Sequence, residues 1–230
     1  MRTNPEIRQT ARAALKNKYG KLMLAVVVYY ALFFAYYIPM NINNLHHDAE
    51  SAVMSICSSV IAVFLFYPLG VGFIYAFRRF FCEGDDNVSA NMFKDGFSNY
   101  WHNLGGYLIM TIRVFLWMLL LIVPGIVMGM AYAMTPFILI DNPELSGWDA
   151  CERSRKMMKG HKWQYFLMAL GFFGLSLASV LTLFIANLWL IPYIQTSKAA
   201  FYESLKEEEQ QHDEQKDLQG QPEVPQEQLV

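Results

Sequence analysis

The sequence predicts an all-α membrane protein: a polytopic bundle of about six transmembrane helices, with amphipathic helices at its cytoplasmic interface and a disordered C-terminal tail. Three observations lead to this fold class. The chain has four long apolar blocks, nearly all charged residues lie outside them, and lysine and arginine gather in only some of the connecting loops. Only 17% of the residues are charged, whereas about 25% are charged in an ordinary soluble domain.

The apolar blocks cover residues 22–40, 53–77, 107–140 and 165–194. The third block has 34 residues, and Arg113 is its only charged side chain. Because one crossing needs about 20 apolar residues, we expect this block to cross twice and to reverse at Pro124-Gly125. A re-entrant passage at residues 131–140 is an alternative. The predicted spans lie near residues 22–40, 53–77, 107–123, 126–140, 164–181 and 183–202.

Lysine and arginine in short loops resist translocation and therefore set the orientation of a membrane protein. Six basic residues precede the first span, whereas residues 41–52 contain none. The N-terminus is therefore predicted to be cytoplasmic and the first loop external. Arg78, Arg79 and Lys94 then follow the second span on the inside, and five more basic residues at 153–162 return to that side.

The last apolar block can be interpreted in two ways. If residues 164–181 and 183–202 are separate spans, both termini are cytoplasmic and 17 of the 18 basic residues, all but Arg113, lie inside. No proline or glycine marks a turn between residues 176 and 182. A five-span alternative with an external tail therefore remains open, because short apolar runs specify reversals poorly.

The polar stretches between the spans predict interfacial helices. Asn-Pro-Glu occurs at residues 4–6 and again at 142–144, and each suits a helix start, since Asn can cap, Pro fits the first turn and Glu complements the helix dipole. After the first start, Ile7, Ala11 and Leu15 form an apolar stripe that we expect on the inner leaflet. Residues 92–107 are a third polar stretch that precedes a span. The chain therefore divides into three units, each an interfacial helix followed by two spans.

The domain boundary is predicted near residue 205. Residues 1–205 form the integral membrane domain. Residues 206–230 are rich in Glu and Gln and contain two prolines. Such a segment cannot bury a core, so it is predicted to be a disordered cytoplasmic tail.

One region carries a specific resemblance. The runs PGI at 124–126, YAMTPFILIDNPELS at 132–146 and SRKMMKGHKW at 154–163 resemble a bacterial integral-membrane family catalogued only as a domain of unknown function (family 975). The likeness extends through residues 192–193 and 200–202, and more loosely to the N-terminal basic helix. It implies a multi-pass protein of the bacterial inner membrane and supplies no activity, substrate or catalytic residue.

Arg113 is the first candidate site residue. A charged group within a span costs about 3 kcal/mol on insertion scales and is by default a functional candidate. It lies about 9 Å from the cytoplasmic end of its span at helical rise, so its guanidinium could also reach lipid phosphate or pair within the protein. Both alternatives remain open: a snorkelling or structural arginine, and a site for an anionic ligand.

The second candidate is a membrane-interface segment on the cytoplasmic side. Basic residues interleaved with tryptophan suit anionic lipid headgroups and the edge of a bilayer. An elaborate joint between two spans is the structural alternative. The candidate lipid contacts are Trp148, Arg153, Arg155, Lys156, Lys159, His161, Lys162 and Trp163.

Other chemistry finds no support in the sequence. The three cysteines form no CxxC pair, and no catalytic or cofactor motif is present. His46 and His47 with Asp48 do not make a convincing metal site, and no basic face suits nucleic acid. We therefore expect no cofactor and no metal, and a non-enzymatic, lipid-interacting scaffold or regulator. The alternative is a small transporter with an internal anionic-ligand site at Arg113.

Overall fold

The computed structural model describes residues 2–16, 18–43, 49–85, 87–182 and 186–220. These residues form helices joined by short turns, and none of them forms a strand, which confirms the predicted all-α class. The elements are α1 (Asn4–Leu15), α2 (Tyr19–Asn43), α3 (Ala49–Glu83), α4 (Val88–Phe97), α5 (Tyr100–Leu120), α6 (Ile122–Ala131), α7 (Thr135–Asp141), α8 (Gly147–Met157), α9 (Lys162–Ala178), the 3-10 turn η1 (Ser179–Thr182) and α10 (Asn187–Gly220).

The element order repeats three times. A short helix precedes a helical hairpin in each case: α1 before α2 and α3, α4 before α5 and α6, and α8 before α9 and α10. This order matches the division into three units predicted from the sequence. Whether the backbones of the units superpose stays a prediction.

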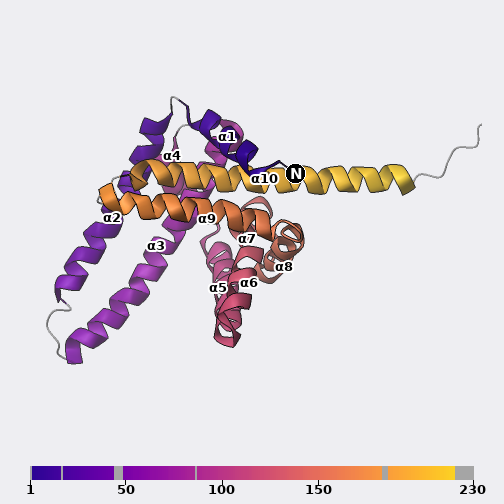
Figure 1. Cartoon of the computed structure of the whole chain (residues 1–230). Helices are drawn as coiled ribbons and strands as arrows, with labels where there is room; N and C mark the ends of the chain where they lie inside the picture. The colour runs from indigo at the N-terminus through magenta and orange to yellow at the C-terminus, as the bar shows by residue number, and fades with distance from the viewer. Residues whose placement is uncertain (1, 17, 44–48, 86, 183–185, 221–230) are drawn as a thin grey trace, which may run out of the picture.

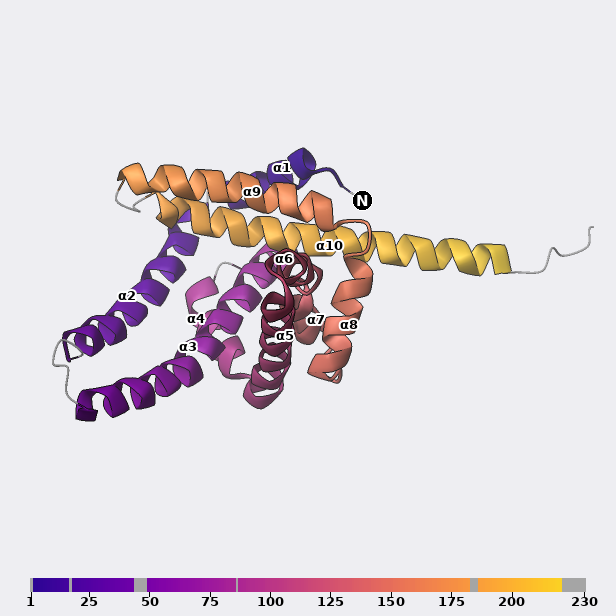
Figure 2. The same cartoon turned by 60° about the horizontal axis from the view of Figure 1, so that its bottom comes forward.

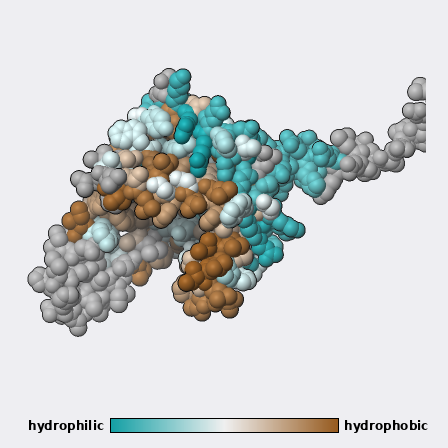
Figure 3. All heavy atoms as spheres, viewed as in Figure 1, coloured by the Kyte–Doolittle hydropathy of each residue, from teal (hydrophilic) through white to brown (hydrophobic). Residues whose placement is uncertain are grey.

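The three hairpins do not form a parallel bundle (Figure 1). The α2–α3 and α5–α6 hairpins project from the body as two separate arms, and the α9–α10 hairpin runs across the end from which both arms leave. Turning the molecule preserves this arrangement (Figure 2). Hydrophobic residues cover the α5–α6 arm and the middle of the molecule, whereas hydrophilic residues gather around α1 and the far part of α10 (Figure 3).

Four described segments are long and apolar enough to cross a membrane: Tyr19–Ile38, Val60–Glu83, Tyr100–Leu120 and Ile122–Asp141. They correspond to the two arms, with α6 and α7 together forming the fourth segment. This result fits a membrane protein. The predicted spans at 164–181 and 183–202 fall on α9, η1 and the first half of α10, and α9 has only 17 residues.

The chain reverses between α5 and α6 slightly earlier than Pro124-Gly125. Leu121 has extended backbone angles, with φ −160° and ψ 143°, and separates the two helices. Pro124 instead lies in the first turn of α6, where its missing N–H leaves no helical hydrogen bond unmade. Gly125 is buried, and a Cβ there would collide with the side chain of Met118. The glycine therefore allows the arm to close rather than making the turn.

The reversal between α9 and α10 also occurs without a glycine or proline. The turn η1 tightens the end of α9, and the Ser179 hydroxyl lies 2.6 Å from the Ser176 carbonyl and 2.9 Å from Asn187 Oδ1. Side-chain hydroxyls can replace backbone partners at such a helix end. The structure therefore contains the hairpin that the six-helix interpretation required.

The apolar stripe of α1 does not face lipid. Ile7, Ala11 and Leu15 are completely buried and belong to the protein core. Thr3, rather than Asn4, caps the helix, and it forms a capping box with Glu6. The sequence predicts that this stripe lies on the inner leaflet. In the structure, α10 and α9 bury the stripe in protein, so it does not contact lipid.

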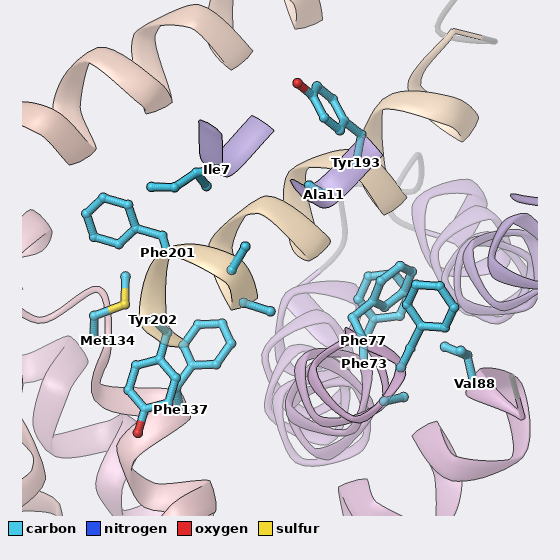
Figure 4. Close-up of a cluster of buried hydrophobic side chains, with 14 of the residues drawn as sticks. Ile7, Ala11, Phe73, Phe77, Val88, Met134, Phe137, Tyr193, Phe201 and Tyr202 are labelled. Atoms are coloured by element: carbon cyan, nitrogen blue, oxygen red, sulfur yellow. The ribbon is translucent and has the colours of Figure 1, made fainter. Parts of the chain in front are cut away.

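The core lies where the base of the arms meets α10 (Figure 4). The rings of Phe73 and Phe77 of α3 contact each other at a tilt, with a ring-centroid distance of 4.7 Å. Phe137 of α7 stacks on Tyr202 of α10 at 5.2 Å. Helix α10 also packs against α1, α2 and α3, and its residues 193–205 are mostly buried.

Two close helix crossings depend on glycine. A Cβ on Gly72 of α3 would collide with the Met92 carbonyl oxygen and lie 2.7 Å from Gly96 Cα of α4. A Cβ on Gly147 of α8 would collide with Gly106 Cα of α5. Small residues of this kind let helix backbones approach closely, and they fix α4 and α8 against the bases of the arms.

The sequence predicts disorder from residue 206, but the structure is helical as far as residue 220, where α10 ends. The first turns of this extension are tied to the body, since Glu207 pairs with Arg2 at 2.8 Å and Glu209 with Arg153 at 3.4 Å. These contacts add tertiary support to a segment too polar to form a core. Residues 221–230, the rest of the predicted tail, lie outside the described residues.

Candidate functional site

Helix α8 carries four of the eight predicted interface residues. Ser146 caps it by accepting a hydrogen bond from the Asp149 backbone N–H at 3.2 Å. Asn142 does not start this helix, because its side-chain amide donates to the Ile138 carbonyl at the end of α7. The second Asn-Pro-Glu run is therefore the turn between α7 and α8, and the helix begins at Gly147, close to α5.

Arg113 is engaged within the protein. Its guanidinium carbon lies 3.4 Å from the centroid of the Trp148 ring and 5.6 Å from that of Tyr132. A cation over an aromatic face is attracted by the negative face of the ring. The Nη1 atom is buried and has no hydrogen-bond partner among the described residues. The contact joins α5 to α8, which favours the structural alternative for this residue.

Cys151 of α8 lies beside the same guanidinium. Burial raises the pKa of its thiol, while Thr135 and Arg113 act in the opposite direction. A raised pKa means that little thiolate forms near neutral pH, and the thiolate is the nucleophilic form. Cys151 is therefore a packing residue at the α8 crossing.

Three of the predicted lipid contacts bind acidic side chains instead. Arg153 contacts Glu209 at 3.4 Å and the Asn142 amide oxygen at 3.3 Å. Arg155 lies 3.4 Å from Glu152, and His161 lies 3.5 Å from Glu208. These pairs reduce the net positive charge of the segment. Among the remaining basic candidates, Lys156 and Lys159 are exposed and Lys162 is half-buried.

An apolar groove lies between α6 and α9, beside Lys162. Its volume is about 400 Å³, within the range of ligand sites in proteins, about 300–1,000 Å³. Lys162 is the one charged residue in its lining, and Trp163 stacks on Phe166 at 5.3 Å while remaining 68% exposed. The lining residues are Val123, Ile126, Val127, Met130, Lys162, Trp163 and Phe166.

A charged network lies at the base of the arms, where α3, α7 and α10 meet. Arg78 forms ion pairs with Asp141 and, at 3.0 Å, with Glu203. Lys206 Nζ lies 2.9 Å from Asp141 Oδ2, and the Tyr202 hydroxyl donates to the same oxygen at 2.9 Å. The Arg78, Asp141 and Glu203 side chains are only 16–21% exposed. The network therefore fixes α10 to both arms.

The sequence alone does not predict this network. It indicates Arg78 as an orientation signal, and it presents Asp141 only within the family resemblance. One signal was present: Asp141 is the first charged residue after Arg113 and ends an apolar block, so a buried partner could be expected for it. The sequence does not identify these partners, because Arg78 on one side and residues 202–206 on the other lie more than 60 residues from Asp141 in the chain.

The described residues contain no group of three or more His, Cys, Asp or Glu side chains arranged to hold a metal ion. His46, His47 and Asp48 lie outside the described residues.

Comparison with known proteins gives one family. Residues 118–209 match the family described as "Protein of unknown function (DUF975)", which confirms the suspected resemblance over that segment. The match includes the groove, α8 and the Asp141 and Glu203 side chains of the network, whereas Arg78 precedes it. The chain matches none of the curated proteins and none of the solved structures.

Proposed function

We propose that this membrane protein is a non-enzymatic, lipid-interacting scaffold or regulator that holds an anionic phospholipid in the groove between α6 and α9. The groove is the observation that carries this proposal. Its walls are apolar side chains of two helices, which suit an acyl chain, and its single cation, Lys162, suits a phosphate headgroup.

The surroundings of the groove support a position at the edge of the bilayer. Trp163 presents an apolar ring beside the lysine, and tryptophan is enriched at membrane–water interfaces. Lys156 and Lys159 are exposed in the preceding turn and add positive charge nearby. The proposal keeps the orientation expected from the loops, with this segment and both termini on the cytoplasmic side of a bacterial inner membrane.

Native mass spectrometry of the gently solubilised protein tests the proposal. We expect the wild type to retain phosphatidylglycerol in preference to phosphatidylcholine, and Lys162→Gln to weaken that preference about fivefold, since one basic residue near a membrane surface contributes about 1 kcal/mol. Val127→Trp should reduce retention of both lipids by filling the groove. Lys16→Gln removes an exposed cation that does not line the groove, and should leave both unchanged.

Equal retention of the two lipids by the wild type, or an equal effect of Lys16→Gln and Lys162→Gln, would overturn the groove as an anionic-lipid site. The same experiment examines the second candidate function, a small transporter. The buried, unpaired Nη1 of Arg113 favours that candidate. A small anion lost only from Arg113→Gln would support transport, and absence of any such ligand from the wild type would remove its basis.

A further inference from the structure

The α9–α10 hairpin packs against a charged helix, which is unusual for a pair of transmembrane helices. Helix α1 runs along it from its open end toward its closed end. At the open end, the Asn4 amide donates to the Gln164 carbonyl at 2.9 Å, and Arg2 pairs with Glu207. Further along, Arg12 lies 5.3 Å from the ring of Tyr193.

Because α1 follows this path, its charged side chains lie beside the middle of the hairpin. Arg8 contacts α9 halfway along its length, with Nη2 3.4 Å from the Met168 carbonyl and its guanidinium carbon 5.2 Å from the Phe172 ring. Nearer the closed end, Arg12 and Lys16 at the end of α1 are exposed as well. A crossing hairpin would carry these cations into the membrane and would place Arg8 near its middle, where a charge costs about 3 kcal/mol or more.

The closed end of the hairpin lies level with the beginning of α2. Tyr19, the first residue of α2, shares a groove of about 410 Å³ with Ser179, Ala186 and Trp189 near the α9–α10 reversal. If α2 crosses the bilayer from Tyr19 onward, that reversal lies at the side of the membrane where α2 starts. The open end and the reversal of the hairpin then lie on the same side of the membrane.

The outer face of α9 is nevertheless apolar. Five of its six exposed large side chains recur at helical spacing and form one stripe, while Met168 and Phe172 on the opposite face are buried. The sixth, Leu175, lines the groove near the α9–α10 reversal. The stripe extends across the molecule beneath the hydrophilic surface of α1 (Figure 3). An apolar face opposite a charged cover is typical of elements that lie in the membrane interface. The stripe consists of Trp163, Leu167, Leu170, Phe173 and Leu177.

We propose that the α9–α10 hairpin does not cross the membrane but lies in the plane of the cytoplasmic leaflet, with the α9 stripe in lipid and α1 covering its aqueous side. The arms α2–α3 and α5–α7 then provide the four crossings. Both termini remain cytoplasmic, and the same 17 basic residues remain inside. This inference is independent of any lipid bound between α6 and α9.

Depth measurements in reconstituted vesicles test the inference. Single cysteines at Leu167, Leu170, Phe173 and Leu177, in a variant lacking Cys57, Cys82 and Cys151, are labelled with a fluorophore and quenched by lipids with spin labels at different acyl positions. Because these sites are exposed, labelling should not disturb packing. Matched controls are the exposed Leu108, Leu116 and Leu120 of α5.

An in-plane hairpin predicts nearly constant, shallow depths along α9, about 5–10 Å below the headgroups. A crossing hairpin predicts a depth change of about 15 Å from Leu167 to Leu177, at 1.5 Å per residue. The α5 controls should change by about 18 Å from Leu108 to Leu120. Constant depths on α9 beside this gradient on α5 support the inference, and equal gradients on both helices overturn it.

Discussion

The α5–α6 arm and the α9–α10 hairpin are both apolar antiparallel helix pairs, yet their surroundings differ. At the closed end of the arm, residues 119–122 are 64–74% exposed, and this end projects away from the other helices (Figure 1). The hairpin is covered along one side by α1, and its open end is tied to Arg2, which precedes α1, and to Arg153 of α8. The first pair is therefore apolar and exposed all round its end, whereas the second has one face covered by protein and one apolar face exposed.

The comparison shows why hydropathy alone gives a poor count of crossings. A run of apolar residues satisfies the length requirement of a span whether its neighbours are lipid or protein. The orientation of the run is decided by what covers its faces. Here the cover is the N-terminal helix, which is separated from α9 by nearly 150 residues in the chain.

Removing Arg78 should have the largest effect on the connection between the arms and the hairpin. Asp141 and Glu203 would remain partly buried without their shared cation. The loss of one partner of a buried pair costs about 3–5 kcal/mol, and because these side chains are 16–21% exposed we expect Arg78→Met to destabilise the protein by about 3 kcal/mol. Thermal unfolding in detergent, followed by tryptophan fluorescence, measures the change.

Two further variants make that experiment specific. Arg2→Gln breaks the exposed pair with Glu207, which should contribute no more than about 1 kcal/mol. The double variant Arg78→Met, Asp141→Leu should recover part of the stability lost in Arg78→Met, since it removes an uncompensated charge. If Arg2→Gln were as damaging as Arg78→Met, the network would have no special role in joining α10 to the arms.

An intermediate effect is expected within the α2–α3 arm. Gly72→Ala should lower stability by about 2 kcal/mol, as overpacking commonly does, because the new methyl group would meet the α4 backbone. Gly20→Ala is the control, since a Cβ there has nothing within 4 Å. The same unfolding assay compares the two variants. Equal stability of Gly72→Ala and wild type would show that α4 can shift away from α3 without loss.

The smallest expected effect concerns the attachment of α8 to the α5–α6 arm. Trp148→Leu removes the aromatic face beneath the Arg113 guanidinium and should cost about 1 kcal/mol. Trp163→Leu is a matched change at an exposed tryptophan without a cation over its ring, and should be nearly neutral for stability. Thermal unfolding in detergent, followed by far-ultraviolet circular dichroism, compares the two variants. Identical behaviour of the two tryptophan variants would contradict a structural role for Arg113.

Some features of the candidate site were accessible from sequence and others were not. Lys162 and Trp163 could be chosen because a basic residue beside tryptophan suits a membrane interface. The pairing of Arg153 with Glu209 could not be foreseen, since it depends on α10 continuing as a helix beyond the apolar block. The partners of Arg78 and Arg113 were equally inaccessible, because side-chain contacts between distant helices leave no local periodic pattern.

The sequence by itself determined the all-α class and the apolar segments, because helical hydrogen bonds and lipid solvation depend on local composition. Only the tertiary structure decided that α1 packs on α9 and α10, that Asp141 binds Arg78, and that the last hairpin runs across the arms. These are contacts among surfaces that become adjacent only after folding. The physical reason is that burial depends on the neighbour of a residue in space, whereas hydropathy records only its neighbours along the chain.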